Sequence, residues 1–242
     1  STDSLHSIDF KNIDNWVQKE ESFICKITSN IELDQAKLTE ITNWKEHNVY
    51  TEVEDNGQYF ITLRWVITQK LKNGTSQYKA RLVARGFEEE EATYRTDSPT
   101  CSFTNLRLLI SVIVSKRWKI HSLDIKCAFL QGKEIDRDIY VKPPREFDNG
   151  HIWKLNRTVY GLKDASRAWY LRVKEELIQL GAQISHYDEA LFLWYENSEL
   201  VGVMSTHVDD FFWSGDSKFE MKVIQNLKQK FKINQEESMT FK

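Results

Sequence analysis

Cysteine, proline and glycine are scarce in this sequence. Its 242 residues include three Cys, three Pro and nine Gly. The cysteines are odd in number, scattered and without metal-ligand spacing, which argues against a disulfide framework or a cysteine zinc site and indicates a reducing compartment. The shortage of Pro and Gly leaves no obvious flexible linker between domains.

Long apolar runs and a strong net charge are missing as well. No apolar run is long enough to cross a membrane and no signal peptide opens the chain, so we expect no membrane partner. The net charge is -3, so the sequence lacks the strongly positive net charge that would by itself indicate nucleic-acid binding. What is present is a hydrophobic content of 40%, with eight Trp and thirteen Phe. This composition supports a substantial core, in one large domain or two small ones, and argues against disorder.

The charged residues are unevenly distributed. Residues 1–55 contain twelve acidic residues and five Lys, whereas residues 59–87 contain six basic residues and no acid. Lys79, Arg81 and Arg85 share one parity, so a strand would point all three to one face. Such a face is usually a solvated edge, but without acidic partners in the hairpin phosphate binding is a competing interpretation.

The periodicity of the apolar residues predicts a mixture of helices and hairpins. Asp34, Ser102 and Asp164 are expected N-caps of three helices, the last of which should end at Gly181. A fourth helix is expected at residues 217–231. Strands are expected at residues 59–68, 78–87, 121–129, 139–141, 152–155, 190–195, 200–208 and 211–214, the first two joined by a turn at residues 72–74. This order predicts an α+β fold.

Two adjacent carboxylates, Asp209 and Asp210, lie between runs of apolar and aromatic residues. Neighbours in a strand point to opposite faces, so both can face one space only in a tight turn. One interpretation is a hairpin with a solvated tip. The other is a metal site, because close carboxylates beside Phe and Trp repel and lose solvation unless a cation, typically Mg²⁺ where phosphates are handled, offsets them. Asp124, a lone acid near the end of an apolar strand, is the candidate third carboxylate; it could instead cap the following turn.

Four motifs in order give the sequence a recognisable character. They are residues 79–87 (Lys-Ala-Arg-Leu-Val-Ala-Arg-Gly-Phe), 123–132 (Leu-Asp-Ile-Lys-Cys-Ala-Phe-Leu-Gln-Gly), 160–165 (Tyr-Gly-Leu-Lys-Asp-Ala) and 207–210 (His-Val-Asp-Asp). Together they resemble the reverse transcriptase domain of copia-type LTR retrotransposons, from about residue 36 to the C-terminus.

The resemblance implies a right-hand polymerase with fingers and a palm, the palm being an antiparallel sheet backed by helices. The chain stops at Lys242, where the family's thumb and ribonuclease H would begin, so a fragment without them is expected. The implied division is an N-terminal extension at 1–35, fingers at 36–98 and 130–160, and palm at 99–129 and 161–242.

The resemblance also implies roles for individual residues. Asp124 and Asp209 would bridge two Mg²⁺ ions, with Mn²⁺ as an alternative. Asp210 would be the third acid and the Ile125 carbonyl a further metal ligand. Residues expected near the incoming nucleotide are Lys79, Arg81, Phe129, Tyr160 and Gly161. Those expected near the primer terminus are His207, which stands where the family usually has Tyr, and Val208.

Two of the implied roles have alternatives. Phe129 would exclude a ribose 2′-hydroxyl, or it is an ordinary core Phe. Either Lys230 or Lys232 would protonate pyrophosphate.

The implied function is RNA-directed DNA synthesis by two-metal nucleotidyl transfer. The implied partners are an RNA or DNA template with primer, dNTPs and the remainder of a polyprotein with thumb, ribonuclease H and integrase. The implied location is the cytoplasm or virus-like particles within it. The competing hypothesis is a domesticated or decayed copy that binds nucleic acid or protein without chemistry. An unrelated metal-dependent nuclease explains neither the basic hairpin nor residues 160–165.

Overall fold

The computed structural model describes residues 31–72, 75–89 and 94–239. The chain divides into two compact units. The smaller unit consists of residues 1–42 and 65–82, and the larger unit consists of residues 43–64 and 83–242. Among the described residues no helix is long and apolar enough to cross a membrane.

The smaller unit combines a helix with a hairpin. Its helix is described from residue 31 to residue 46, the last four of which belong to the larger unit. The predicted N-cap Asp34 is wrong, because this residue lies inside the helix. Strands β2 (Leu63–Lys72) and β3 (Thr75–Ala84) form a two-stranded sheet. The helix contacts the hairpin through Glu40, whose Oε1 accepts a hydrogen bond from the Leu82 amide at 3.2 Å. This hairpin was predicted, although β2 begins four residues later than expected and the turn residues 73–74 lie outside the described part of the chain.

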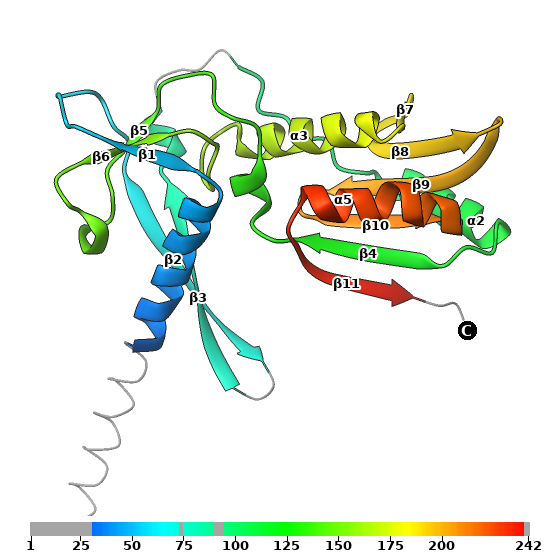
Figure 1. The fold of residues 1–242 in the computed structure, drawn as a ribbon, viewed down its shortest axis with the longest axis horizontal. Coiled ribbons are helices and arrows are strands. Elements are labelled where there is room, and N and C mark those ends of the chain that lie inside the picture. The colour runs from blue at the N-terminus through cyan, green and yellow to red at the C-terminus, as the bar shows by residue number, and fades with distance from the viewer. Residues whose placement is uncertain (1–30, 73–74, 90–93, 240–242) are drawn as a thin grey trace, which may run out of the picture. The chain divides into compact units, whose positions relative to one another are not determined.

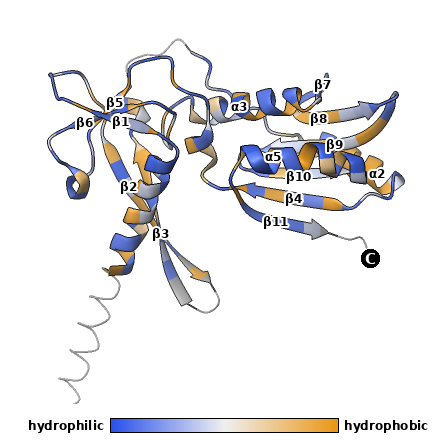
Figure 2. Ribbon diagram, viewed as in Figure 1, coloured by the Kyte–Doolittle hydropathy of each residue, from blue (hydrophilic) through white to orange (hydrophobic). Residues whose placement is uncertain are grey.

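The larger unit is built on a six-stranded antiparallel sheet with the order β11-β4-β10-β9-β8-β7 (Figure 1). The bounds of its strands are β4 (Ile120–Ile125), β7 (Gln183–Ser185), β8 (Asp188–Glu196), β9 (Glu199–His207), β10 (Asp210–Gly215) and β11 (Ile233–Met239). Figure 2 shows apolar stretches along β4 and β8, in keeping with a sheet that is covered by helices, whereas β11 is mostly hydrophilic.

Helices cover both faces of this sheet, because its strands alternate apolar side chains between them. Helix α3 (Ala165–Gln179) and the continuous helical segment α4 (Ser217–Phe219), η4 (Glu220–Ile224) and α5 (Gln225–Lys230) share one core with Leu123 and Phe211. Helix α2 (Phe103–Ser115) packs with Val203 and Phe212. Since Phe211 and Phe212 are neighbours in β10, the two cores lie on opposite faces of the sheet.

The larger unit also contains a three-stranded sheet with the order β1-β6-β5. Its strands are β1 (Tyr50–Val53), β5 (Tyr140–Val141) and β6 (Ile152–Leu155), and the Tyr50 and Trp153 rings stack at 4.0 Å. Short 3-10 turns occur at η1 (Gly86–Glu88), η2 (Ala128–Gln131) and η3 (Arg145–Phe147). The α+β prediction is confirmed in its coarse form of mixed helices and antiparallel sheets.

The predicted helix caps have different outcomes. Ser102 caps α2, because its Oγ accepts a hydrogen bond from the Asn105 amide. Gly181 follows the end of α3 with φ 88°, a left-handed conformation that favours glycine. Asp164 occupies the N-cap position of α3 but makes no side-chain cap. Its carboxylate accepts hydrogen bonds from the Arg137 guanidinium instead.

The strand predicted at residues 121–129 is too long. Strand β4 ends at Ile125, and Cys127 then adopts φ 53°, which ends the extended chain. Phe129 consequently lies on η2. Arg85 is also outside its predicted strand, one residue beyond β3, and its guanidinium pairs with Glu88 at 3.8 Å. It therefore does not extend the row of Lys79 and Arg81 along a strand face.

Candidate active site

Strands β4, β9 and β10 bring the three predicted acids to one end of the sheet. Asp124 and Asp210 are direct partners in the antiparallel pairing of β4 with β10, so their side chains project from the same face. Asp210 is also paired with His207, which leaves Val208 and Asp209 as a two-residue turn. The Asp209 carbonyl accepts a hydrogen bond from the Ile125 amide at 2.9 Å. The turn is thereby attached to the end of β4.

The turn itself holds an unusual backbone conformation. Val208 has φ 56°, which is strained for a β-branched residue. Its carbonyl accepts a hydrogen bond from Nε1 of the buried Trp169 at 2.6 Å. The sequence gives no signal of this contact, because Trp169 lies among the buried apolar residues of α3. Helix α3 therefore helps to fix the position of the two acids.

Burial and the proximity of the three acids both affect the pKa of Asp210. Partial burial, followed by the charges of Asp209 and Asp124, raises the pKa of Asp210 above its usual range. Among the described residues, no Lys or Arg forms an ion pair with any of the three. Among the described residues only the charge of His207 acts to lower the pKa of Asp210, so the negative charge of the site has no Lys or Arg partner.

A divalent cation fits the chemistry of these donors, since carboxylate oxygens are the ligands that Mg²⁺ takes. The described residues contain no ready group of three or more His, Cys, Asp or Glu side chains that could hold a metal. Mg²⁺ is commonly held by one or two carboxylates together with substrate phosphates, so a closed protein cage is not required. Asp124, Asp209 and Asp210 are the residues that could contribute such ligands.

Asn234 joins this site without having been predicted. Its Nδ2 donates a short hydrogen bond to Oδ2 of Asp124 from strand β11. Nothing in the sequence of β11 signals this contact, because the strand has no apolar alternation and was not predicted at all.

Two of the predicted nucleotide-binding residues contact each other. The rings of Phe129 and Tyr160 meet edge to face with centroids 4.9 Å apart. Phe129 is partly buried and packs against the main core, so the structure leaves it with both a packing contact and an exposed part. The Tyr160 carbonyl accepts a hydrogen bond from the Ala84 amide at 2.7 Å, which joins two of the four sequence motifs.

Glycine at position 161 is required by this close approach of two backbones. Gly161 has φ 93°, and a Cβ there would lie 2.0 Å from the Ala84 carbonyl oxygen. Gly86 has the reciprocal constraint, since its Cβ would lie 2.2 Å from the Gly161 carbonyl oxygen. The glycines of the two motifs therefore have a packing role that is independent of any nucleotide.

The remaining predicted residues are distributed between the two units. Lys79 and Arg81 lie on the part of β3 that belongs to the smaller unit, and their role toward a triphosphate stays a prediction. His207 is exposed at the end of β9, directly before the Val208–Asp209 turn.

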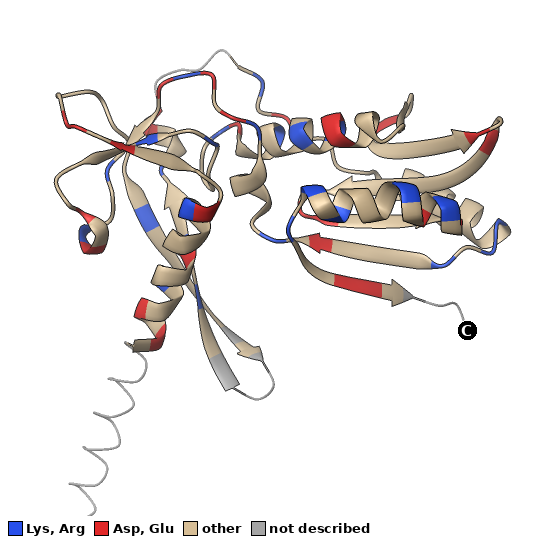
Figure 3. Cartoon of the chain, in the orientation of Figure 1, with Lys and Arg blue, Asp and Glu red and all other residues tan. Residues whose placement is uncertain are grey.

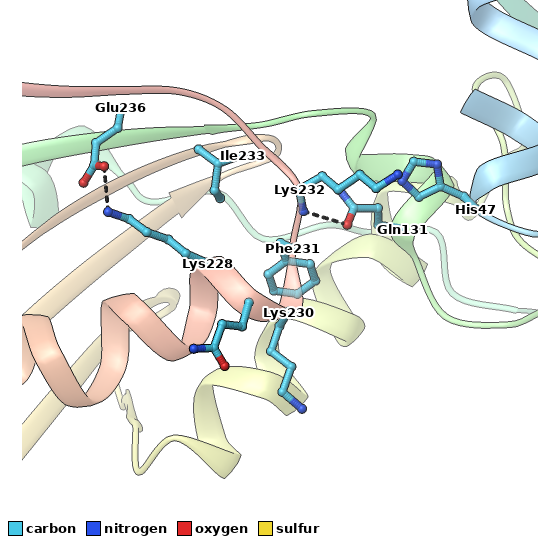
Figure 4. A pocket seen from close by; sticks show the side chains of 9 residues that line it. His47, Gln131, Lys228, Lys230, Phe231, Lys232, Ile233 and Glu236 are labelled. Carbon is cyan, nitrogen blue, oxygen red and sulfur yellow. Dashed lines mark hydrogen bonds and ion pairs between the residues drawn. The ribbon is translucent and has the colours of Figure 1, made fainter. Parts of the chain in front are cut away.

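Lys230 and Lys232 border an open hollow of about 550 Å³ beside β11 (Figure 4). Its lining residues are His47, Gln131, Lys228, Gln229, Lys230, Phe231, Lys232, Ile233 and Glu236. Lys232 Nζ pairs with Glu46 at 2.8 Å, and Lys230 Nζ lies 3.6 Å from Glu176. Figure 3 shows basic residues along α5 and acidic residues on β11. Both candidate lysines are thus held by acidic partners in this structure.

Comparison with known proteins gives consistent matches. Residues 47–241 match the family described as reverse transcriptase (RNA-dependent DNA polymerase). The chain is 34% identical over 187 residues to the retrovirus-related Pol polyprotein from transposon RE1 of Arabidopsis thaliana, covering 74% of this chain and 13% of that protein. It is 32% identical to the corresponding polyprotein from transposon RE2 of the same plant, with the same coverage of both chains. It is 28% identical to that from transposon TNT 1-94 of Nicotiana tabacum, covering 77% of this chain and 15% of that protein.

Proposed function

Because this chain belongs to the reverse transcriptase (RNA-dependent DNA polymerase) family, in its copia-type branch, we propose that it copies a nucleic-acid template into DNA. It would add dNTPs to a primer 3′-hydroxyl on an RNA or DNA template. The observation that carries the proposal is the cross-strand pairing of Asp124 with Asp210, with Asp209 in the adjoining turn. The chain spans 13% of the length of the two Arabidopsis relatives, so the remaining domains of such a polyprotein would be its partners.

The acids would hold the divalent cations of the reaction, with Mg²⁺ as the expected ion and Mn²⁺ as a substitute. Asp124, Asp209 and Asp210 would supply carboxylate oxygens, and Ile125 would add its carbonyl. When bound, a pair of such ions lowers the pKa of the primer hydroxyl and stabilises the leaving pyrophosphate. The contribution of the chain is to hold three carboxylates at fixed positions before the substrate arrives, which reduces the reorganisation needed during the reaction.

Other residues would position the substrates. Lys79 and Arg81 would contact the triphosphate, and Phe129, Tyr160 and Gly161 would border the incoming nucleotide. His207 and Val208 would lie at the primer terminus. Fingers at 36–98 and 130–160, with palm at 99–129 and 161–242, remain the proposed division, and we propose action in the cytoplasm or in particles within it.

Primer extension tests the proposed function directly. The chain is incubated with poly(rA)/oligo(dT), dTTP and Mg²⁺, with parallel reactions that contain a chelator or the Asp124→Asn variant. We expect extension that the chelator stops and Asp124→Asn lacks. Template binding without extension in all three reactions would instead support a decayed, non-catalytic copy.

A further inference from the structure

The side chain of Asn234 reaches the Asp124 carboxylate from an irregular point of strand β11. This strand pairs with β4, but the register shifts between Ile233, the partner of Ile125, and Gln235, the partner of Asp124. Asn234 is therefore the extra residue of a β-bulge, and bulges beside active sites redirect a side chain. Here the redirected amide donates from Nδ2 to Oδ2 of Asp124 at 2.5 Å.

The chemistry of an amide suits this position. Within the described part of the chain, Asn234 is the one side chain that donates a hydrogen bond to any of the three carboxylates. A lysine or arginine in its place would neutralise Asp124 and compete with a bound cation. A neutral donor stabilises the carboxylate, restricts its rotation and occupies Oδ2, which leaves Oδ1 for a cation.

We propose that Asn234 is a positioning residue that holds the Asp124 carboxylate in its metal-binding orientation. This inference rests on the proposed polymerase function of the same site. Groups that hydrogen-bond to metal ligands fix the orientation of those ligands, and their loss typically weakens metal affinity or activity by about 10- to 100-fold. The bulge in β11 would then be a device that delivers this one side chain to the end of β4.

The decisive comparison is between two neighbouring alanine variants. Asn234→Ala removes the hydrogen bond to Asp124. Gln235→Ala is the matched control, because Gln235 lies in the same bulge while its Nε2 donates to Glu237. A general effect of disturbing β11 would appear in both variants.

Two measurements separate positioning from folding. The first is binding of Tb³⁺, a hard cation with oxygen ligands, to the protein without nucleic acid. Its luminescence is excited through tryptophan, and Trp169 contacts the Val208 carbonyl next to Asp209. The second is the Mg²⁺ concentration that gives half-maximal primer extension. Both are recorded below the thermal midpoint of each variant, so that folded protein is compared.

We expect Asn234→Ala to raise the Tb³⁺ dissociation constant and the half-activating Mg²⁺ concentration by about 10-fold or more. High Mg²⁺ should recover most of its extension rate, and Gln235→Ala should leave both values unchanged. Equal Tb³⁺ constants in the two variants would overturn the inference, whatever their thermal midpoints.

The inference and the proposed function fail in different ways. If wild-type protein extends primers and Asn234→Ala does so with an unchanged Mg²⁺ requirement, only the role of Asn234 is lost. If wild-type protein does not extend primers, and Asp124→Asn binds Tb³⁺ as wild type does, the proposed active site itself is wrong.

Discussion

The larger unit contains two groups of acidic side chains that differ in how their charge is balanced. In the first, Glu89 and Asp164 surround Arg137, which donates two hydrogen bonds to Asp164 at 2.7 and 3.0 Å. The side chains of Glu89 and Asp164 are only 8% and 14% exposed. Tyr94 completes the group, with its ring 4.2 Å from the Arg137 guanidinium and its hydroxyl hydrogen-bonded to Glu89. We call these four residues the closed cluster.

The second group, Asp124, Asp209 and Asp210, lies at the end of the six-stranded sheet and is called the open cluster. Among the described residues no Lys or Arg pairs with it. Burial, and then the charges of Asp209 and Asp124, raise the pKa of Asp210. In the closed cluster burial and the hydrogen bond to Glu89 raise the pKa of Tyr94, but Arg137 supplies the balancing charge. We infer from this difference that the closed cluster stabilises the fold, whereas the open cluster is the proposed site of a cation.

The largest effect should follow from neutralising the open cluster. Asp209→Asn should reduce primer extension by about 10²- to 10³-fold or more, the scale of losing one pre-organised charged group at a reaction centre. The thermal midpoint should stay the same or rise, because repulsion among the acids decreases.

Exposed Glu54 provides the control for this variant. Glu54→Gln should change neither extension rate nor midpoint. Full extension by Asp209→Asn would mean that the turn is a solvated hairpin tip.

Opening the closed cluster should have the opposite result, a loss of stability without a direct loss of chemistry. Arg137→Ala leaves two largely buried carboxylates without their cation, which should lower the free energy of unfolding by about 3 kcal/mol. Urea unfolding followed by tryptophan fluorescence measures this change.

The exposed pair of Arg95 and Asp97, at 2.8 Å, is the matched comparison. Arg95→Ala should cost less than about 1 kcal/mol, as exposed ion pairs do. If the two arginine variants are equally stable, the closed cluster does not differ from ordinary surface pairing.

A smaller effect is expected at Phe129, which lies on η2 after strand β4. If Phe129 excludes a ribose 2′-oxygen by steric conflict, Phe129→Val should admit ribonucleotides and leave dNTP incorporation largely intact. Incorporation of rUTP and dTTP should be measured alongside the thermal midpoint.

The competing interpretation of Phe129 is core packing. In that case the cavity left by Phe129→Val should lower stability by about 1–3 kcal/mol, with both activities falling together. An equal loss of both activities, together with a lower thermal midpoint, would show that Phe129 is a packing residue.

The two clusters differ in how far the sequence could predict them. Asp124, Asp209 and Asp210 were found because they interrupt apolar strands, and alternation along a strand fixes where such acids emerge. Asp164 was predicted as an N-cap from its local position, but its partner Arg137 is 27 residues away. A bidentate Arg–carboxylate contact of this kind depends on tertiary structure and overrides the local preference for capping.

Other features were hidden because they depend on register or on single backbone angles. Residues 233–239 contain Asn, Gln, Glu and Ser where an apolar alternation would be needed to predict β11. The bulge that redirects Asn234 arises only when this strand pairs with β4. Likewise, the left-handed conformation of Cys127, which ends β4 and places Phe129 on η2, has no sequence signal because the residue is not glycine.

The strained turn at Val208 has a consequence for local opening. The Val208 carbonyl accepts a hydrogen bond from Trp169 of α3, and the Asp209 carbonyl accepts one from Ile125 of β4. Both hydrogen bonds must therefore break before the turn can change its conformation. The Ile125 amide proton should then exchange with solvent only in events that disrupt the sheet and α3 together, and not through fraying of the hairpin. The carboxylates are thereby tied to the sheet and to α3, although Asp209 and Asp210 are exposed. Their geometry would persist until the sheet itself unfolds.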